Sequence, residues 1–309
     1  MVRGLHGPVF VGPELDHSVR VALTEAGIEV VGDLGFCESP RVAITIDPTV
    51  IPPTVEWVHC PFMGVDSLLG HLPATVQVLT RTTVGMPERI GSYTSTAVAA
   101  ERWGFHTYYQ RQSQHLWEQT ILGGLPDPSD SSAVQDLSAV ILGTGWVGSA
   151  VAQGIRTQFG DLVGVSLSGE SKPFFDRVLP FNKAPWEEAD CVIGAVPLTP
   201  HTSKILGEQV FLRLTGAHLV LVGRGATVDF DALRVALDQG QVRHATIDVY
   251  PVEPIPDGEW LWDHPHLTLT PHISGLTIPS DIVSAFLAVR DDLLAGRTPD
   301  VLVNFRRGY

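Results

Sequence analysis

The feature that most constrains this chain is an apolar run that leads directly into a glycine-rich turn. Residues 138–148 read Ser-Ala-Val-Ile-Leu-Gly-Thr-Gly-Trp-Val-Gly, the pattern of a buried strand followed by G-x-G-x-x-G at the start of a helix. In this motif the first glycine makes the tight turn, the second lets the backbone approach a pyrophosphate, and the third lets the helix pack on the strand. The turn predicts a dinucleotide site with the contacts Gly143, Gly145, Trp146, Val147 and Gly148.

The residues around this turn extend the same pattern. Apolar runs alternate with amphipathic segments, which is typical of a parallel sheet covered by helices. We expect strands at 139–142, 162–167, 191–196, 218–222, 245–249 and 267–270, and helices at 204–214 and 231–239, the second ended by Gly240. A glycine turn alone would also suit a purely structural role, but the ordered set predicts a doubly wound, Rossmann-type domain.

A second, smaller α/β pattern occupies the beginning of the chain, with expected strands at 9–11, 42–46 and 55–59. A long helical stretch follows Ile90 and runs towards Trp117, before a Gly/Pro/Ser-rich segment at 123–132. Near the other end Ile282, Phe286, Val289 and Leu293 share one helix face, and Gly296 can end that helix. We therefore predict a two-lobed α/β protein: a nucleotide-binding domain (98–275) inserted in a smaller flavodoxin-like substrate domain (1–97 and 276–309).

Composition narrows the partners and the compartment. The 34 acidic and 20 basic residues give a net charge of −14, which repels polyanions, so we expect no nucleic-acid or anionic-membrane partner. The first residues lack the apolar core of a signal peptide, and no run is long enough to span a bilayer, which favours a cytoplasmic location. Cys37, Cys60 and Cys191 have no CxxC or Cys/His spacing, so we expect reduced packing residues and no metal site.

The end of the second strand of the nucleotide domain bears on cofactor choice. An NAD site usually has Asp or Glu there, about 20 residues after the glycine turn, to bind the ribose hydroxyls. This chain has Ser166, Leu167 and Ser168 instead, with Lys172 close by. The serines could donate to a 2′-phosphate, which favours NADP over NAD, although serines that merely tolerate either cofactor would look the same.

Four further motifs follow in order. They are Pro-Leu-Thr-Pro-His-Thr at 197–202, Val-Gly-Arg-Gly at 222–225, Asp-Val-Tyr-Pro-Val-Glu-Pro-Ile-Pro at 248–256, and a segment at 261–272 that ends in Thr-Pro-His. With them the chain resembles the D-isomer-specific 2-hydroxyacid dehydrogenases, continuously from about Ile90 to Thr277. Tyr109-Gln110, Trp117 and the Gly91-x-Tyr93 pattern look most like the short glyoxylate/hydroxypyruvate reductase branch.

The resemblance implies a role for each candidate residue. Arg224 would grip the substrate carboxylate and polarise the C2 carbonyl, His272 would be the acid/base, and Glu253 would bond its second nitrogen. Asp248 would contact the nicotinamide carboxamide. The remaining implied cofactor contacts are Pro197, Val222, Gly223 and Ser274. Singly, each residue also has an ordinary explanation, such as a surface ion pair or a loop acid, and His264 and His266 are nearby alternatives to His272.

The family also binds the carboxylate with backbone amides of a loop in the small domain. The matching stretch is 59–66, where Gly64-Val65-Asp66 fits, so Met63 and Gly64 are the candidate substrate contacts and Phe62 or Met63 could line the pocket or pack in the core. Ser92 stands where the family usually carries Glu, so the hinge segment 90–93 departs from the family pattern.

These patterns predict an enzyme that transfers hydride between NAD(P)H and the C2 carbon of a small 2-oxo or 2-hydroxy acid of the D series, for example glyoxylate or hydroxypyruvate. Two alternatives stay open: a phosphoglycerate dehydrogenase-like activity, and a nucleotide-sensing binding protein of the corepressor type. Because family members dimerise through the nucleotide domain, we expect a homodimer in which an arm at about 108–132 crosses the twofold axis.

Overall fold

The computed structural model describes residues 5–32, 39–117 and 134–309. It divides into two compact units, Met1–Met86 with Thr277–Tyr309, and Pro87–Leu276. The sequence pattern placed these boundaries at 97/98 and 275/276. The first boundary lies earlier because helix α2 starts at Met86 and runs without a break to Arg102.

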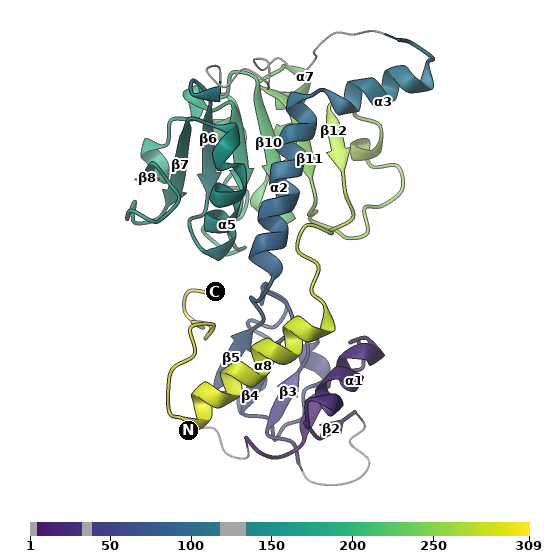
Figure 1. Cartoon of the computed structure of the whole chain (residues 1–309), viewed down its shortest axis with the longest axis vertical. Coiled ribbons are helices and arrows are strands. Elements are labelled where there is room, and N and C mark those ends of the chain that lie inside the picture. Colours follow the sequence, from purple (N-terminus) through teal and green to yellow (C-terminus); the bar gives the residue numbers. More distant parts are fainter. Residues whose placement is uncertain (1–4, 33–38, 118–133) are drawn as a thin grey trace. The chain divides into compact units, whose positions relative to one another are not determined.

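The unit that holds the N-terminus is built on a five-stranded parallel sheet with the order β2-β1-β3-β4-β5, the flavodoxin-like order (Figure 1). Its strands are β1 (Val9–Val11), β2 (Val30–Val31), β3 (Val42–Ile44), β4 (Trp57–Cys60) and β5 (Val78–Arg81). Its helices are α1 (His17–Glu25) and α8 (Pro279–Leu294). Ile282, Phe286 and Val289 of α8 are buried with β1 and α1, and the Phe286 ring stacks on Trp57 at 5.0 Å between centroids.

The other unit carries a seven-stranded parallel sheet with the order β12-β11-β10-β9-β6-β7-β8. Its strands are β6 (Ser138–Leu142), β7 (Asp161–Ser166), β8 (Arg177–Pro180), β9 (Cys191–Gly194), β10 (Ala217–Leu221), β11 (Val242–Ile247) and β12 (Leu267–Leu269). Read from β8 to β11, this is the 3-2-1-4-5-6 order of a dinucleotide-binding fold, with β12 added at the edge. The predicted Rossmann-type domain is confirmed.

Helices cover both faces of this larger sheet. They are α2 (Met86–Arg102), α5 (Trp146–Ile155), α6 (Glu208–Phe211) and α7 (Phe230–Asp238). Helix α3 (Phe105–Ser113) has no buried residue and projects from the sheet beyond the end of α2 (Figure 1). Neighbouring residues of β6 point to opposite faces: Ala139 and Ile141 pack with α2 and α5, while Val140 and Leu142 pack with α6 and α7. The sheet is therefore buried on both sides, which explains its continuous apolar runs.

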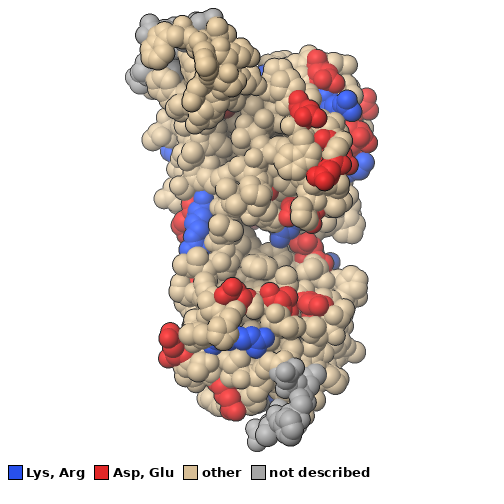
Figure 2. All heavy atoms as spheres, turned by 90° about the vertical axis from the view of Figure 1, so that its right-hand side faces the viewer, with Lys and Arg blue, Asp and Glu red and all other residues tan. Residues whose placement is uncertain are grey.

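Short 3-10 turns lie between these elements, at Pro48–Val50, Arg156–Gln158, Phe181–Lys183, Trp186–Glu188, Gly225–Thr227 and Trp260–Trp262. No helix in the described part of the chain has the length and apolar character needed to span a bilayer. Cys60 and Cys191 are buried free thiols, as predicted, whereas Cys37 and the 123–132 segment lie outside the described residues. On the face seen in Figure 2, acidic side chains are spread over the surface and the basic ones are scattered.

Two predicted helices differ from the structure for identifiable reasons. The 204–214 helix shrinks to α6, because Leu206 forms a β-bridge with Val228 and Lys204 has a positive φ of 52°. The long helix after Ile90 divides into α2 and α3, because Gly104 adopts a left-handed conformation at φ 66° that a helix cannot continue through. Strands β2, β5 and β8 were not expected.

Candidate active site

The glycine turn after β6 has a crowded side and an open side. Gly143 has a φ of 107°, and a side chain there would stand 2.7 Å from the carbonyl oxygen of Ala195. A Cβ at Gly148 would collide with the carbonyl oxygen of Gly143, so the helix and the turn are in direct backbone contact. At Gly145 a Cβ would meet no atom within 4 Å in the described chain.

That open side lies at the N-terminus of α5, where Gly145 is the N-cap and no described side chain caps the helix. A helix N-terminus approached closely by ligand is what binding of a pyrophosphate requires. The residues present therefore fit a dinucleotide. Trp146, the first residue of α5, is partly exposed at the same place.

The last residue of β7 and the loop that follows it carry two serine hydroxyls and one paired carboxylate. Ser166 Oγ accepts from Gly169 N at 3.0 Å, and Ser168 Oγ accepts from Glu170 N at 3.2 Å. Each hydroxyl keeps its own proton to donate to a ligand. The carboxylate of Glu170, which the sequence pattern did not single out, lies 3.5 Å from Lys172 Nζ.

Loops that follow the parallel strands of this unit meet at one edge of the sheet, because parallel strands end at the same edge. Pro197 follows β9, Arg224 follows β10, and Asp248 follows β11. Thr202 Oγ1 donates to Pro197 O at 2.6 Å, which closes the 197–202 loop on itself. A Cβ at Gly225 would collide with the backbone of Tyr250, so the Arg224 loop packs directly on the Asp248 loop.

Asp248 is completely buried and organises the loop after β12. Its Oδ1 accepts from Thr270 Oγ1 at 2.6 Å and from Ile273 N at 2.8 Å, and its Oδ2 accepts from Ser274 N at 2.8 Å. These three bonds compensate the carboxylate for its loss of hydration. They fix the backbone on both sides of residue 272, a role that the sequence did not reveal.

Two tyrosines complete this support. Tyr93 OH lies 2.6 Å from Thr270 Oγ1, and Tyr250 OH donates to the carbonyl oxygens of Ile247 and Thr270. Burial raises the pKa of Tyr93 to about 12, so its hydroxyl stays protonated at neutral pH. In the sequence Tyr93 stands out only as part of a family pattern, because nothing local connects helix α2 with the loop after β12.

His272 and Glu253 form the pair that the resemblance implied. His272 Nδ1 lies 2.7 Å from Glu253 Oε2, while Glu253 Oε1 accepts from Tyr250 N at 2.9 Å. With Nδ1–H donating to the carboxylate, Nε2 is left for a ligand. His272 has a φ of 53°, in the left-handed region, and strained residues of this kind cluster at functional sites.

The other candidate residues are divided between the two units. Arg224 is half-buried and donates from Nη1 to Gly223 O at 2.9 Å. Ser274 is buried beside Asp248, and Val222 is buried at the end of β10. His264 lies 3.4 Å from Asp238 and His266 N donates to His264 Nδ1, so neither is paired with Glu253. Met63 and Gly64 belong to the other unit, in the loop after β4.

Comparison with known proteins identifies the family. Residues 96–274 match the family model of the D-isomer specific 2-hydroxyacid dehydrogenase, NAD binding domain. The chain belongs to this family. It is thus an NAD(P)-dependent D-2-hydroxyacid dehydrogenase, and the resemblance found in the sequence is confirmed.

Three relatives illustrate the match. The uncharacterized protein in the mprR 3′ region of Streptomyces coelicolor is 37% identical over 282 residues, covering 89% of this chain and 98% of that protein. Glyoxylate/hydroxypyruvate reductase A of Serratia proteamaculans (strain 568) is 34% identical over 259 residues, covering 80% of this chain and 79% of the relative. A D-isomer specific 2-hydroxyacid dehydrogenase from Xanthobacter autotrophicus Py2, solved with NADPH, superposes with a TM-score of 0.84 at 25% identity, covering 98% and 99% of the two chains.

The two faces of the glycine turn lead to a paired prediction. Gly145→Ala should leave the free energy of unfolding within about 0.5 kcal/mol of the wild type, because the new methyl group meets no atom of the described residues within 4 Å and φ is −77°. It should nevertheless weaken NADPH binding, because that methyl group occupies the approach to the helix N-terminus. Urea unfolding and fluorescence titration with NADPH measure the two effects.

Gly148→Ala is the matched control. Its methyl group collides with the carbonyl oxygen of Gly143, so stability should fall by about 1–3 kcal/mol. If Gly145→Ala bound NADPH as tightly as the wild type, the pyrophosphate would have to lie elsewhere.

Proposed function

We propose that this dehydrogenase reduces a small 2-oxo acid, with glyoxylate and hydroxypyruvate as the leading candidates, and oxidises the corresponding D-2-hydroxy acid in the reverse direction. The observation that carries the proposal is the His272–Glu253 pair at 2.7 Å, held at the edge of the sheet by the Asp248 loop. The similarity to glyoxylate/hydroxypyruvate reductase A supports this choice of substrates.

In this proposal His272 moves the proton. A bound NAD(P)H supplies the hydride to C2. His272 Nε2, protonated before reduction, gives its proton to the C2 carbonyl oxygen and takes it back in the reverse reaction. Glu253 stabilises the imidazolium through Nδ1 and keeps the ring in the orientation that turns Nε2 outward. The 2-oxo acid gains one hydride and one proton, and a 2-hydroxy acid results.

Arg224 is proposed to bind the substrate carboxylate. In a protein of net charge −14, an anionic substrate needs a local positive group. The guanidinium presents its donors in a fixed fork that matches a carboxylate, and the bond from Nη1 to Gly223 O helps to orient it.

The cofactor is proposed to lie along the loops already described. Its pyrophosphate would contact the 143–148 turn, its ribose would contact Ser166 and Ser168, and its nicotinamide end would lie near Pro197, Val222, Gly223, Asp248 and Ser274. Asp248 accepts three hydrogen bonds and has no exposed surface, so a carboxamide donor would reach its remaining lone pair, on Oδ2, only if the loop after β12 shifts.

His272→Asn tests the proton-transfer role. The kcat for glyoxylate and hydroxypyruvate should fall by roughly 10²–10⁴-fold, because a positioned acid is lost, while NADPH binding is retained. His266→Asn, which changes an exposed histidine of the same segment, should keep wild-type rates.

The substrates assayed should also include longer 2-oxo acids and 3-phosphohydroxypyruvate. Turnover of the phosphorylated acid alone would point instead to a phosphoglycerate dehydrogenase-like activity, and near-normal kcat in His272→Asn would refute the mechanism.

We further propose a preference for NADPH. The hydroxyls of Ser166 and Ser168 can donate to a 2′-phosphate, and the related Xanthobacter enzyme was solved with NADPH. Since no arginine is present in the 166–172 segment, the preference should be on the order of one hydrogen bond to a charged group, roughly 1.5–3 kcal/mol.

Ser168→Asp should reverse the preference for NADPH, because the new carboxylate repels the 2′-phosphate. Ser168→Asn is the control: asparagine has the shape of aspartate without its charge, so this variant should still prefer NADPH. The measurement is kcat/KM for both cofactors; a wild type that prefers NADH tenfold contradicts this interpretation.

We also propose a homodimer. Around α3 (Figure 1) large apolar side chains are exposed: Trp103 (45%), Phe105 (48%), Tyr109 (67%) and Trp117 (90%). A group of exposed aromatic side chains of this kind indicates an interface with another protein surface.

Tyr109→Glu should shift the molecular mass measured by light scattering towards that of the monomer. Leu212→Glu, at an exposed leucine outside this group, should leave the mass unchanged. A wild type that is monomeric at micromolar concentration would exclude the dimer. Most of the predicted 108–132 arm lies outside the described residues.

A further inference from the structure

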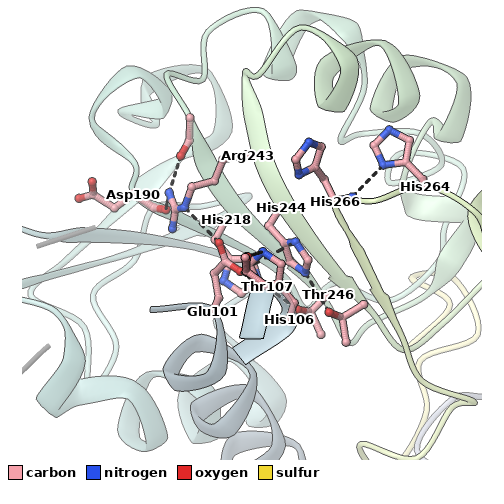
Figure 3. A network of polar contacts seen from close by, with 12 residues as sticks. Glu101, His106, Thr107, Asp190, His218, Arg243, His244, Thr246, His264 and His266 are labelled. Atoms are coloured by element: carbon pink, nitrogen blue, oxygen red, sulfur yellow. Dashed lines mark hydrogen bonds and ion pairs between the residues drawn. The ribbon is translucent and has the colours of Figure 1, made fainter. Parts of the chain in front are cut away.

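Three ionisable side chains of the nucleotide-binding unit converge at a place that hydride transfer does not use. Glu101 lies in the last turn of α2, His106 lies in the first turn of α3, and His244 lies on β11. Figure 3 shows the three side chains directed towards one another at the corner where α2 gives way to α3. The left-handed Gly104 makes that corner and brings His106 back to Glu101.

The spacing of the three inner atoms suits a metal ion. Glu101 Oε2 lies 3.1 Å from His106 Nδ1 and 3.8 Å from His244 Nδ1, and the three atoms lie within 4.8 Å of one another. A tetrahedral zinc ion with bonds of about 2.0–2.1 Å places its ligands about 3.3 Å apart. Movements of a few tenths of an ångström would bring the two measured separations to that value.

The outer nitrogen of each imidazole is already engaged. His106 Nε2 lies 3.0 Å from Thr107 Oγ1, and His244 Nε2 lies 2.9 Å from Thr268 Oγ1. When Nε2–H donates to the threonine, Nδ1 carries a lone pair and can bind an ion. The two rings stack at 4.4 Å between centroids with 29° between their planes, so one ring has to turn for both lone pairs to meet at the ion. Metal-binding histidines are oriented in this way by a hydrogen bond from their second nitrogen.

The inner atoms are poorly satisfied without a cation. Glu101 Oε2, His106 Nδ1 and His244 Nδ1 are buried and make no hydrogen bond of acceptable geometry within the described chain. Buried polar atoms are normally bonded, and one proton between Glu101 and His106 would still leave His244 Nδ1 without a partner. The side chains of Glu101 and His244 are only 3% and 2% exposed, whereas His106 is 23% exposed and leaves a path for an ion from solvent.

We propose that Glu101, His106 and His244 bind one divalent transition-metal ion, with zinc as the best match and water as the fourth ligand. Two imidazoles and one carboxylate form a donor set that zinc accepts in proteins. The ion ties the α2–α3 corner to strand β11 and has a structural role. The sequence predicted no metal site. Its ligands come from the α2–α3 corner and from β11, which are far apart in the chain, so no short cysteine or histidine spacing indicates them.

One competing arrangement uses the same carboxylate. Arg243 Nε lies 3.4 Å from Glu101 Oε1, and Arg243 Nη1 donates to the backbone oxygens of Asp190 and Gly216. In this metal-free alternative, Arg243 balances the charge of Glu101, and His106 donates a hydrogen bond from Nδ1–H to Glu101 Oε2. In the metal-bound form, Oε2 and both Nδ1 atoms bind the ion instead, while Arg243 still contacts Oε1.

The test is metal binding to the whole chain, with no need for enzyme activity. After treatment with a chelator, titration with Zn²⁺ in a calorimeter should give one site per chain, and Co²⁺ should give the visible spectrum of a tetrahedral site. Zinc should also raise the unfolding temperature. His106→Gln should weaken binding by more than about tenfold, and Thr268→Val, which removes only the support of His244, by about 10–100-fold.

His264→Gln is the matched control, because His264 and His266 form a separate pair in the same unit (Figure 3). His106 is partly exposed, so its glutamine variant should fold, which circular dichroism and urea unfolding of the apo forms can verify. Zinc binding that is lost in His106→Gln and kept in His264→Gln supports the site. No zinc binding by the wild type, or binding that falls only in His264→Gln, overturns it.

Discussion

The active-site region depends on one buried carboxylate. Asp248 follows the last residues of β11, has no exposed surface, and accepts three hydrogen bonds from the loop after β12. Without those donors the charge would be costly to bury, and without the charge the loop would have no common anchor. Because two of the three donors are backbone amides on the far side of His272, the carboxylate fixes the main chain that turns this histidine towards Glu253. The left-handed φ of His272 persists because both flanks are held.

Much of the fold could be predicted from sequence because its central strands are buried on both faces and therefore appear as uninterrupted apolar runs. The strands β6, β7, β9, β10 and β11 were found for that reason. The edge elements were harder. Strand β2 has two residues, and β8 begins with an exposed arginine, so neither has a periodic signal. The lost 204–214 helix shows the other limit: Leu206 is an apolar residue at helical spacing, yet its backbone pairs with Val228, a partner that no local pattern reveals.

The candidate site could also be predicted from the sequence only in part. Arg224, Glu253 and His272 stand in motifs whose order along the chain indicated a common site, and the structure brings Glu253 and His272 into hydrogen-bond contact. The role of Tyr93 could not be assigned from sequence spacing, because its hydrogen bond to Thr270 links helix α2 to a loop 177 residues further along the chain. The Glu101, His106 and His244 cluster escaped for the same reason. Contacts between distant elements depend on the packed sheet, and the sequence displays them only after the fold is known.

The parallel sheet has a consequence for how such a protein can change. All the chemical groups discussed for catalysis in this unit stand on loops beyond the strand ends, whereas the strands beneath are held by apolar packing and by glycines that allow backbone contact. Scaffold and chemistry are therefore under separate selection. Substitutions in the loops that follow the strands can change which acid is bound without unfolding the sheet. A methyl group added at Gly143 or Gly148 would instead collide with backbone atoms and disturb the packing of the sheet. Divergence of function should accordingly be concentrated in a small fraction of the chain.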